Sequence, residues 1–337
     1  MQLAQFVAEL FPKRPLARIS PLTSTASAPP AWSAAPSANA FGDVAVAHHE
    51  VLFLDNGLSV TQPLSAALGR AGLWYPPPCR DSGSWLLPGS WADFFKQAGY
   101  ATLTPDWPDD PETVEEARAN PDVLARKTLK RVADHTAAVI GKLEKKPAVM
   151  GHSTGGLLAQ TLAGRGLSAA TVAIDPGVFR GVLPLPFSVL KGVGPFLVNP
   201  RTRGRAITLT FDQFKYGWTN ALDEDEAKRL YDTYHVAGSG IALAQMANAN
   251  LNPWTESRVD TKNPDRGPLL ILDGEKDHTV PWAIANASYK RQKRNPSVTE
   301  IKKMRNRGHS LTIDHGWQEV AQTALDFVKR FVPAKPM

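Results

Sequence analysis

Short runs rich in apolar and β-branched residues recur along most of the chain, and each predicts a buried strand. They are VLFL (51–54), YATLTPDWP (100–108), PAVMG (147–151), ATVAID (170–175), PLLILD (268–273) and VTEIKKM (298–304). Helical patterns separate most of them: WADFFKQAG (91–99), a long stretch over 122–143, GGLLAQTLAG (155–164), AIANASYKRQKR (283–294) and GWQEVAQTALDFVKRF (316–331). We therefore expect an α/β fold, with a mostly parallel central sheet flanked by helices on both faces.

One region interrupts this rhythm. From 176 to 267, proline- and aromatic-rich text such as VLPLPFSVL and FDQFKYGWTNAL replaces the alternation. We expect a largely helical cap inserted here, between two parts of a core that covers 43–175 and 268–337. The apolar side chains of the cap either pack it onto the core or suit an apolar substrate.

Composition excludes several classes of protein. The 337 residues are 43% hydrophobic and 21% charged, with a net charge of +6 and one cysteine, Cys79. No disulfide within the chain and no cysteine-based metal site is possible. No nucleic-acid-binding signature accompanies the mild basic excess, and no run of about 18 apolar residues predicts a transmembrane segment. The composition is that of a soluble globular protein.

Residues 1–42 differ from the rest. They are rich in Ser, Ala and Pro and lack the apolar core of a secretory signal. We expect a disordered or targeting-like N-terminal tail, and a cytoplasmic protein, with a mitochondrial one as the alternative.

The chemistry begins at Gly151-His152-Ser153-Thr154-Gly155, a G-x-S-x-G pattern between a predicted strand and a predicted helix. Small residues two positions either side of a serine allow a sharp strand-to-helix turn that exposes its hydroxyl. The amide groups at the start of the helix are suited to a developing oxyanion. The alternative is a serine that only caps the helix.

A serine nucleophile needs a base and a group that orients the base. Asp277 follows one strand and His309 precedes the last helix, so the chain order is Ser153, Asp277, His309. Loops at the carboxyl ends of parallel strands meet at one edge of the sheet. Asp175 is a second candidate for the acid. We expect turn roles for Asp273 and Glu275, a packing or lining role for His152, and surface or capping roles for His278 and His315.

The arrangement of Ser153, Asp277 and His309 along the chain resembles that of the alpha/beta-hydrolase fold superfamily, and in particular of a single-domain serine hydrolase with an inserted cap. The likeness covers about residues 84–332, through WLLPGSWADFFKQAGYATLTPDWP, VMGHSTGGLLAQ, AIDPGVFRGVLPLP, GEKDHTVP and RGHSLTIDHGW. It implies Ser153 as nucleophile, His309 as general base and acid, and Asp277 as the orienting carboxylate. It also implies the backbone N–H of Thr154 as one oxyanion donor, and no cofactor or metal.

The segment that supplies the second oxyanion donor in this family is interrupted. VLFLDNGL is followed by 26 residues without clear periodicity (59–84) before WLLPGSW begins. These residues are a surface excursion, a gating loop or an error in the coding sequence. The second donor is Leu58 if the turn directly follows the strand, or Ser84 if the chain re-enters just before Trp85.

We expect a cofactor-independent serine hydrolase of carboxylic esters or related acyl bonds, acting through an acyl-enzyme on a small, apolar substrate. The alternatives are an acyltransferase or perhydrolase with the same triad, or a catalytically weak ligand-binding protein. A basic cluster remains outside this chemistry: Lys290, Arg291, Lys293, Arg294, Lys302, Lys303, Arg305 and Arg307. It is either a solvated face or a surface that attracts anionic substrates or membranes.

Overall fold

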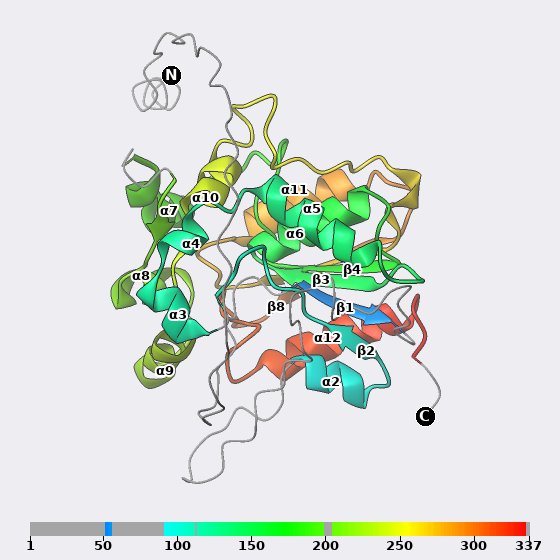
Figure 1. Cartoon of the computed structure of the whole chain (residues 1–337), viewed down its shortest axis with the longest axis horizontal. Helices are drawn as coiled ribbons and strands as arrows, with labels where there is room; N and C mark the ends of the chain where they lie inside the picture. The colour runs from blue at the N-terminus through cyan, green and yellow to red at the C-terminus, as the bar shows by residue number, and fades with distance from the viewer. Residues whose placement is uncertain (1–50, 56–90, 112, 199–203, 335–337) are drawn as a thin grey trace, which may run out of the picture. The chain divides into compact units, whose positions relative to one another are not determined.

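The computed structural model describes residues 51–55, 91–111, 113–198 and 204–334, which all belong to one unit spanning Asp43–Met337 (Figure 1). The predicted tail (1–42), the interrupted segment (59–84), Leu58 and Ser84 lie outside these residues. Within the described part, no helix is long and apolar enough to cross a membrane.

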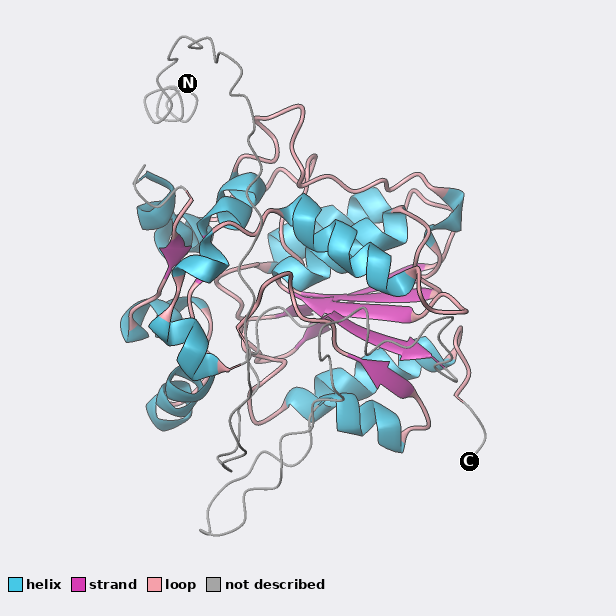
Figure 2. Cartoon of the chain, in the orientation of Figure 1, coloured by secondary structure: helices cyan, strands magenta, loops and turns pink. Residues whose placement is uncertain are grey.

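A six-stranded sheet forms the centre of this unit (Figure 2). Its order is β2-β1-β3-β4-β7-β8, with bounds β1 Val51–Asp55, β2 Ala101–Leu103, β3 Ala148–His152, β4 Ala170–Ile174, β7 Leu269–Gly274 and β8 Thr299–Met304. The strands β3, β4, β7 and β8 pair in parallel, as their apolar runs and the helices between them predict. The mostly parallel sheet is therefore confirmed.

Strand β1 departs from that pattern. It pairs antiparallel with both β2 and β3, with Val51 opposite Gly151 and Leu54 opposite Ala148. The chain therefore leaves β1 at the edge of the sheet opposite to the carboxyl end of β3. An apolar run does not specify the direction of a strand, because its neighbours in the sheet decide that.

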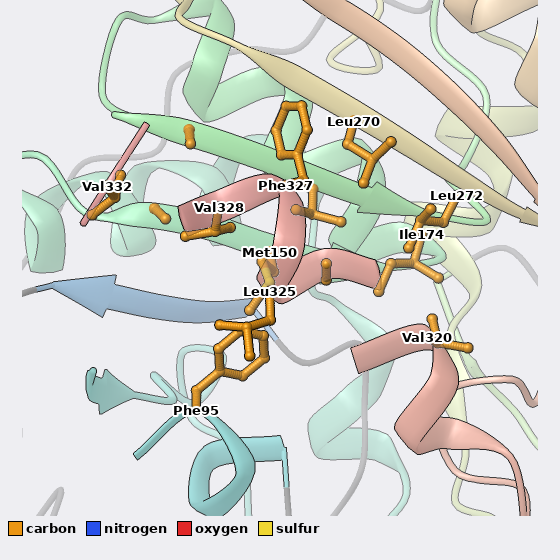
Figure 3. Close-up of a cluster of buried hydrophobic side chains, with 14 of the residues drawn as sticks. Phe95, Met150, Ile174, Leu270, Leu272, Val320, Leu325, Phe327, Val328 and Val332 are labelled. Carbon is orange, nitrogen blue, oxygen red and sulfur yellow. The ribbon is translucent and has the colours of Figure 1, made fainter. Parts of the chain in front are cut away.

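Helices cover both faces of the sheet. On one side lie α5 (Leu129–Ile140), α6 (Thr154–Gly164) and α11 (Trp282–Gln292), and on the other α2 (Trp91–Gln97) and α12 (Trp317–Lys329) (Figure 1). Successive side chains of a strand point to opposite faces. Met150 thus packs with α2 and α12 in the core shown in Figure 3, whereas Val149 packs with α5 and α6.

The predicted helix over 122–143 is wrong in its extent, because the structure divides it into α4 (Asp122–Ala125) and α5. Thr128 caps α5 by accepting a hydrogen bond from the backbone N–H of Arg131. Lys127, between the two helices, is buried and pairs with Asp110. A buried ammonium group needs such a partner, and the break in the helix lets Lys127 reach it.

Between β4 and β7, the residues that the structure describes (175–198 and 204–268) contribute no strand to the central sheet. They form α7 (Phe187–Val198), α8 (Phe211–Gly217), α9 (Glu224–Tyr234), α10 (Gly240–Ala247) and a short 3₁₀ turn, η3 (Pro264–Arg266), with β5 (Ala206–Ile207) and β6 (Gly238–Ser239) as a separate pair. Helices α3 (Val114–Ala119) and α4 pack against this segment, through Val114, Leu124 and Val236. The sequence of α3 and α4 does not predict that they contact this segment.

Phe95 anchors α2 in the core, where it contacts the rings of Trp91, Phe94 and Tyr100. Its side chain is fully buried. Phe95→Ala will lower the free energy of unfolding by about 3–5 kcal/mol, through lost burial and the cavity left behind. Urea denaturation measures this. The matched control is Phe187→Ala, at a residue 78% exposed, which will change stability by less than about 0.5 kcal/mol. Equal effects of the two substitutions would contradict the packing.

Candidate active site

Ser153 occupies the turn between β3 and α6, and its backbone is in an unusual conformation. Its φ is 54° and its ψ is −116°, a region that residues with a Cβ rarely adopt. Three backbone hydrogen bonds hold it there. Ser153 N–H donates to the carbonyl of Ile174 (2.9 Å), and the Ser153 carbonyl accepts from Leu157 N–H (3.2 Å) and Gly177 N–H (2.9 Å).

The glycines around Ser153 are required by the close approach of β3 and α6. A Cβ at Gly151 would lie 2.2 Å from the carbonyl oxygen of Gly155, and one at Gly156 would lie 2.9 Å from that of Ile174. Both contacts are with backbone atoms, which cannot move aside without displacing α6 or β4. The glycine spacing in the sequence therefore reflects a packing requirement as well as a turn.

His309 lies in the loop between β8 and α12 and reaches Ser153. Its Nε2 is 3.0 Å from Ser153 Oγ, and its Nδ1 is 2.6 Å from Asp277 Oδ2. The imidazole is fully buried. With Nδ1 protonated and donating to Asp277, Nε2 is the ring nitrogen that accepts the serine proton.

Asp277 lies in the loop after β7 and is held by its own backbone. Its Oδ1 accepts hydrogen bonds from the N–H groups of Thr279 (2.6 Å) and Val280 (2.9 Å). This leaves Oδ2 directed at His309. The three residues Ser153, Asp277 and His309, distant in sequence, thus form one continuous hydrogen-bonded chain.

Asp175, the alternative acid, is near the same imidazole but farther away. It follows β4 with a φ of 40°, and its Oδ1 accepts from Gly274 N–H at 2.8 Å. Its Oδ2 is 3.7 Å from His309 Nδ1, beyond hydrogen-bond distance. Burial, followed by the nearby carboxylates of Asp277 and Asp273, raises the pKa of Asp175 well above its usual range. Asp277, at 2.6 Å from Nδ1, is therefore the closer partner of the imidazole.

Asp273 differs from the expectation of a turn residue. It lies within β7, fully buried, and neither carboxyl oxygen has a hydrogen-bond partner among the residues described. Burial and the neighbouring Asp277 raise its pKa to about 9. Glu275 does have a turn role, because its Oε2 accepts from the backbone N–H of Asn306, whose φ is 59°.

Thr154 is the first residue of α6, directly after Ser153. Its N–H is one of the amide groups that a helix start leaves without an intrahelical partner. For the second donor the structure tests neither Leu58 nor Ser84.

Two aromatic neighbours of His309 complete its surroundings. The Trp218 ring meets the His309 ring edge-on, with centroids 4.6 Å apart, and His152 lies at the same distance. Trp218 comes from the segment between β4 and β7, and its carbonyl accepts from Ser310 N–H at 3.0 Å. From the sequence, Trp218 is only one of the apolar residues of the predicted cap, since no local pattern links it to His309.

The two histidines with expected surface or capping roles, His278 and His315, have partners other than Ser153 and Asp277. His278 Nδ1 is 2.9 Å from the carbonyl oxygen of Tyr216, and His315 Nδ1 is 2.8 Å from Glu226 Oε2.

His152, Asp175 and His309 place potential metal-ligand atoms within 4.8 Å of one another. Both ring nitrogens of His309 are hydrogen-bonded, however, so binding a metal there would break the chain to Ser153 or Asp277.

Comparisons with known proteins identify the family of the chain and its fold. A sequence model of the "Alpha/beta hydrolase family" matches residues 71–323. Among solved structures, the monoacylglycerol lipase of Paleococcus ferrophilus is 18% identical, with a TM-score of 0.50 over 72% of this chain and 88% of that one. A non-heme bromoperoxidase, BpoC, of Mycobacterium tuberculosis is 15% identical, with a TM-score of 0.49 over 70% and 84%. No curated protein matches the sequence. At these identities the structural likeness shows the fold alone.

The raised pKa of Asp273 makes stability depend on pH. Asp273 is protonated in the folded chain at neutral pH, but it ionises in the unfolded chain above about pH 4. Its contribution to stability is complete below that pH and is lost as the pH rises through about 9. Asp273→Asn, uncharged at every pH, will therefore raise the free energy of unfolding by about 1–3 kcal/mol at mildly alkaline pH, and by less in acid.

Urea denaturation at about pH 5 and about pH 8 measures that difference. Asp212→Asn, at an exposed position on α8, is the control and will give the same change at both pH values. A gain for Asp273→Asn that does not grow with pH would contradict the assignment.

Proposed function

Because the chain belongs to the alpha/beta hydrolase family, we propose that it hydrolyses carboxylic esters or related acyl bonds through a serine acyl-enzyme. Ser153 is the nucleophile, His309 the general base and acid, and Asp277 the orienting carboxylate. The observation that carries the proposal is the hydrogen-bonded chain from Ser153 Oγ through His309 to Asp277, at 3.0 Å and 2.6 Å.

The first half of the reaction forms the acyl-enzyme. Ser153 Oγ attacks the acyl carbonyl carbon as its proton passes to His309 Nε2, and Asp277 stabilises the imidazolium that results. The carbonyl oxygen becomes an oxyanion, and the N–H of Thr154 at the start of α6 donates a hydrogen bond to it. His309 then returns the proton to the leaving alkoxide, which departs as an alcohol.

The second half repeats these roles with water. His309 Nε2 takes a proton from water, whose oxygen attacks the acyl carbon. The tetrahedral intermediate collapses, the carbon–Oγ bond breaks, and the proton on Nε2 returns to Ser153 Oγ. The products are a carboxylic acid and the regenerated enzyme, and no step calls for a group outside the chain and water.

Apolar side chains near Ser153 support an apolar acyl group as substrate. Met246 of α10 lies against Gly177, where an added Cβ would be 2.7 Å from its Sδ and 3.5 Å from the Ser153 carbonyl oxygen. Trp218 covers His309 from the same segment of chain. Neither contributes a charge that would recognise an ionic substrate.

An activated Ser153 will react with a fluorophosphonate probe. The wild-type protein will be labelled, and Ser153→Ala will not. Hydrolysis of p-nitrophenyl butyrate will fall about 10⁴-fold or more in Ser153→Ala and His309→Ala, because the nucleophile and its base act as a unit. Ser188→Ala, at a serine of α7, is the matched control and will retain both properties. A folded wild-type protein that neither reacts nor hydrolyses would identify a ligand-binding member of the family instead.

The two nearby acids are distinguished by substitution. Asp277→Asn will lower kcat about 10⁴-fold, because the amide holds His309 in the wrong tautomer. Asp175→Asn will lower it far less, because Asp175 is beyond hydrogen-bond distance of Nδ1. Steady-state kinetics on the same ester measures both values. A larger loss in Asp175→Asn would assign the acid role to Asp175.

A further inference from the structure

Exposed apolar side chains are concentrated in one place. The described residues include six large hydrophobic side chains that are exposed, and five of them lie between 183 and 254: Leu183, Leu185, Phe187, Leu251 and Trp254. Phe187 is 78% exposed and Trp254 is 86% exposed. Single exposed apolar residues are common, but five aliphatic and aromatic side chains gathered in this way are typical of a binding surface.

Hydrogen bonds join the two stretches that carry these side chains. The side chain of Asn250 accepts from Gly181 N–H (2.6 Å) and donates to the Val182 carbonyl (2.7 Å). Arg180 Nη1 donates to the carbonyl of Asn252 at 2.8 Å. We call residues 180–187 and 250–254 the paired loops, because these bonds make them one surface.

The exposure is not a sign of poor packing. Phe179 and Val182, on the same stretch as Leu183, are buried in an apolar cluster with Ala242 of α10 and Ile284 of α11. The apolar residues needed to fill the space beneath the paired loops are therefore already supplied. Leu183, Leu185 and Phe187 are additional to this cluster.

Positive charge accompanies the paired loops. Arg291 of α11 donates from Nη1 to the carbonyl of Gly181 at 3.1 Å, so the basic end of α11 adjoins them. The stretches 177–198, 247–255 and 281–295 contain no Asp or Glu and carry six cationic residues: Arg180, Lys191, Lys290, Arg291, Lys293 and Arg294. Lys290, Arg291, Lys293 and Arg294 are all exposed.

We propose that the paired loops and the basic end of α11 form a docking surface for a membrane that contains anionic lipids. Trp254 in a turn and Phe187 at the start of α7 suit the boundary between headgroups and acyl chains, where an apolar ring can be buried at the surface of the bilayer. Lys and Arg beside them attract anionic headgroups. Charge complementarity selects this partner over a neutral apolar one.

The proposed surface is continuous with the site along the chain. Gly177 N–H donates to the Ser153 carbonyl, and Leu183 follows only six residues later. A membrane at the paired loops would hold lipid-derived acyl groups close to the site. The proposal goes beyond the proposed function and does not rest on it, because membrane binding is measured with the Ser153→Ala protein.

The test is cosedimentation of full-length Ser153→Ala protein with vesicles, either of phosphatidylcholine alone or of phosphatidylcholine mixed with phosphatidylglycerol. We expect binding to the mixed vesicles, and weaker binding to phosphatidylcholine alone. Adding Phe187→Ser and Trp254→Ser will lower the partition coefficient on both vesicles by about tenfold or more, through lost apolar burial. Adding Lys293→Glu and Arg294→Glu will lower it on mixed vesicles only, as will high salt.

Two control variants make the same kinds of substitution outside the proposed surface. Val298→Ser removes a large hydrophobic side chain that, of those described, is the one exposed outside the paired loops. Lys228→Glu with Arg229→Glu reverses two exposed charges on α9. Neither will change binding beyond about twofold. Circular dichroism verifies that each variant is folded.

Three outcomes would overturn the proposal. One is a folded protein that binds neither vesicle. Another is a Phe187→Ser, Trp254→Ser variant that binds as the parent does. The third is a parent that is dimeric by size-exclusion chromatography and becomes monomeric in that variant without a change in vesicle binding, which would assign the surface to a second copy of the chain.

Discussion

The close approach of strand β3 to helix α6 is the constraint on which the site depends. Gly151 lets its backbone approach that of Gly155 in α6, and Ser153, in the turn between them, has a φ of 54°. Such a φ costs of order 1–3 kcal/mol and persists only where its surroundings determine it. Here the bonds to Ile174 and Gly177 come from β4 and from the chain that follows it, so the neighbouring strand holds the nucleophile in place.

A second constraint is electrostatic, because the three carboxyl groups of Asp175, Asp273 and Asp277 are buried close to one another. Full ionisation of all three would place like charges together in a medium that screens them poorly. The pKa values of Asp175 and Asp273 are accordingly raised, first by burial and then by the neighbouring carboxylates, and that of Asp273 reaches about 9. Asp277 instead accepts hydrogen bonds from two backbone N–H groups, and its Oδ2 lies 2.6 Å from His309 Nδ1. Environment, not residue type, therefore distinguishes the roles of these acids.

The sequence predicts the parts of the site that depend on local patterns. The glycine spacing around Ser153 indicates the turn, and the positions of Asp277 and His309 after strands indicate the edge of the sheet where they meet. It does not predict the direction of β1, which pairing with two neighbours decides. Nor does it predict Trp218 against His309, or Asp273 inside a strand, because both follow from packing between distant segments. Nor does it predict that Leu183 and Phe187 are exposed, since an apolar run carries no information on which of its members fill the core.

The chain after β4 links these features. Asp175 lies beside the imidazole, Gly177 bonds to Ser153, Phe179 is buried and Leu183 is exposed, all within nine residues. The Gly177 bond and the Asp175 φ of 40° fix the start of this stretch, and the bonds from Asn250 fix its outer end. The stretch that bonds to the backbone of the nucleophile and the stretch that exposes Leu183 are therefore one short segment, held at both ends by hydrogen bonds to other parts of the chain.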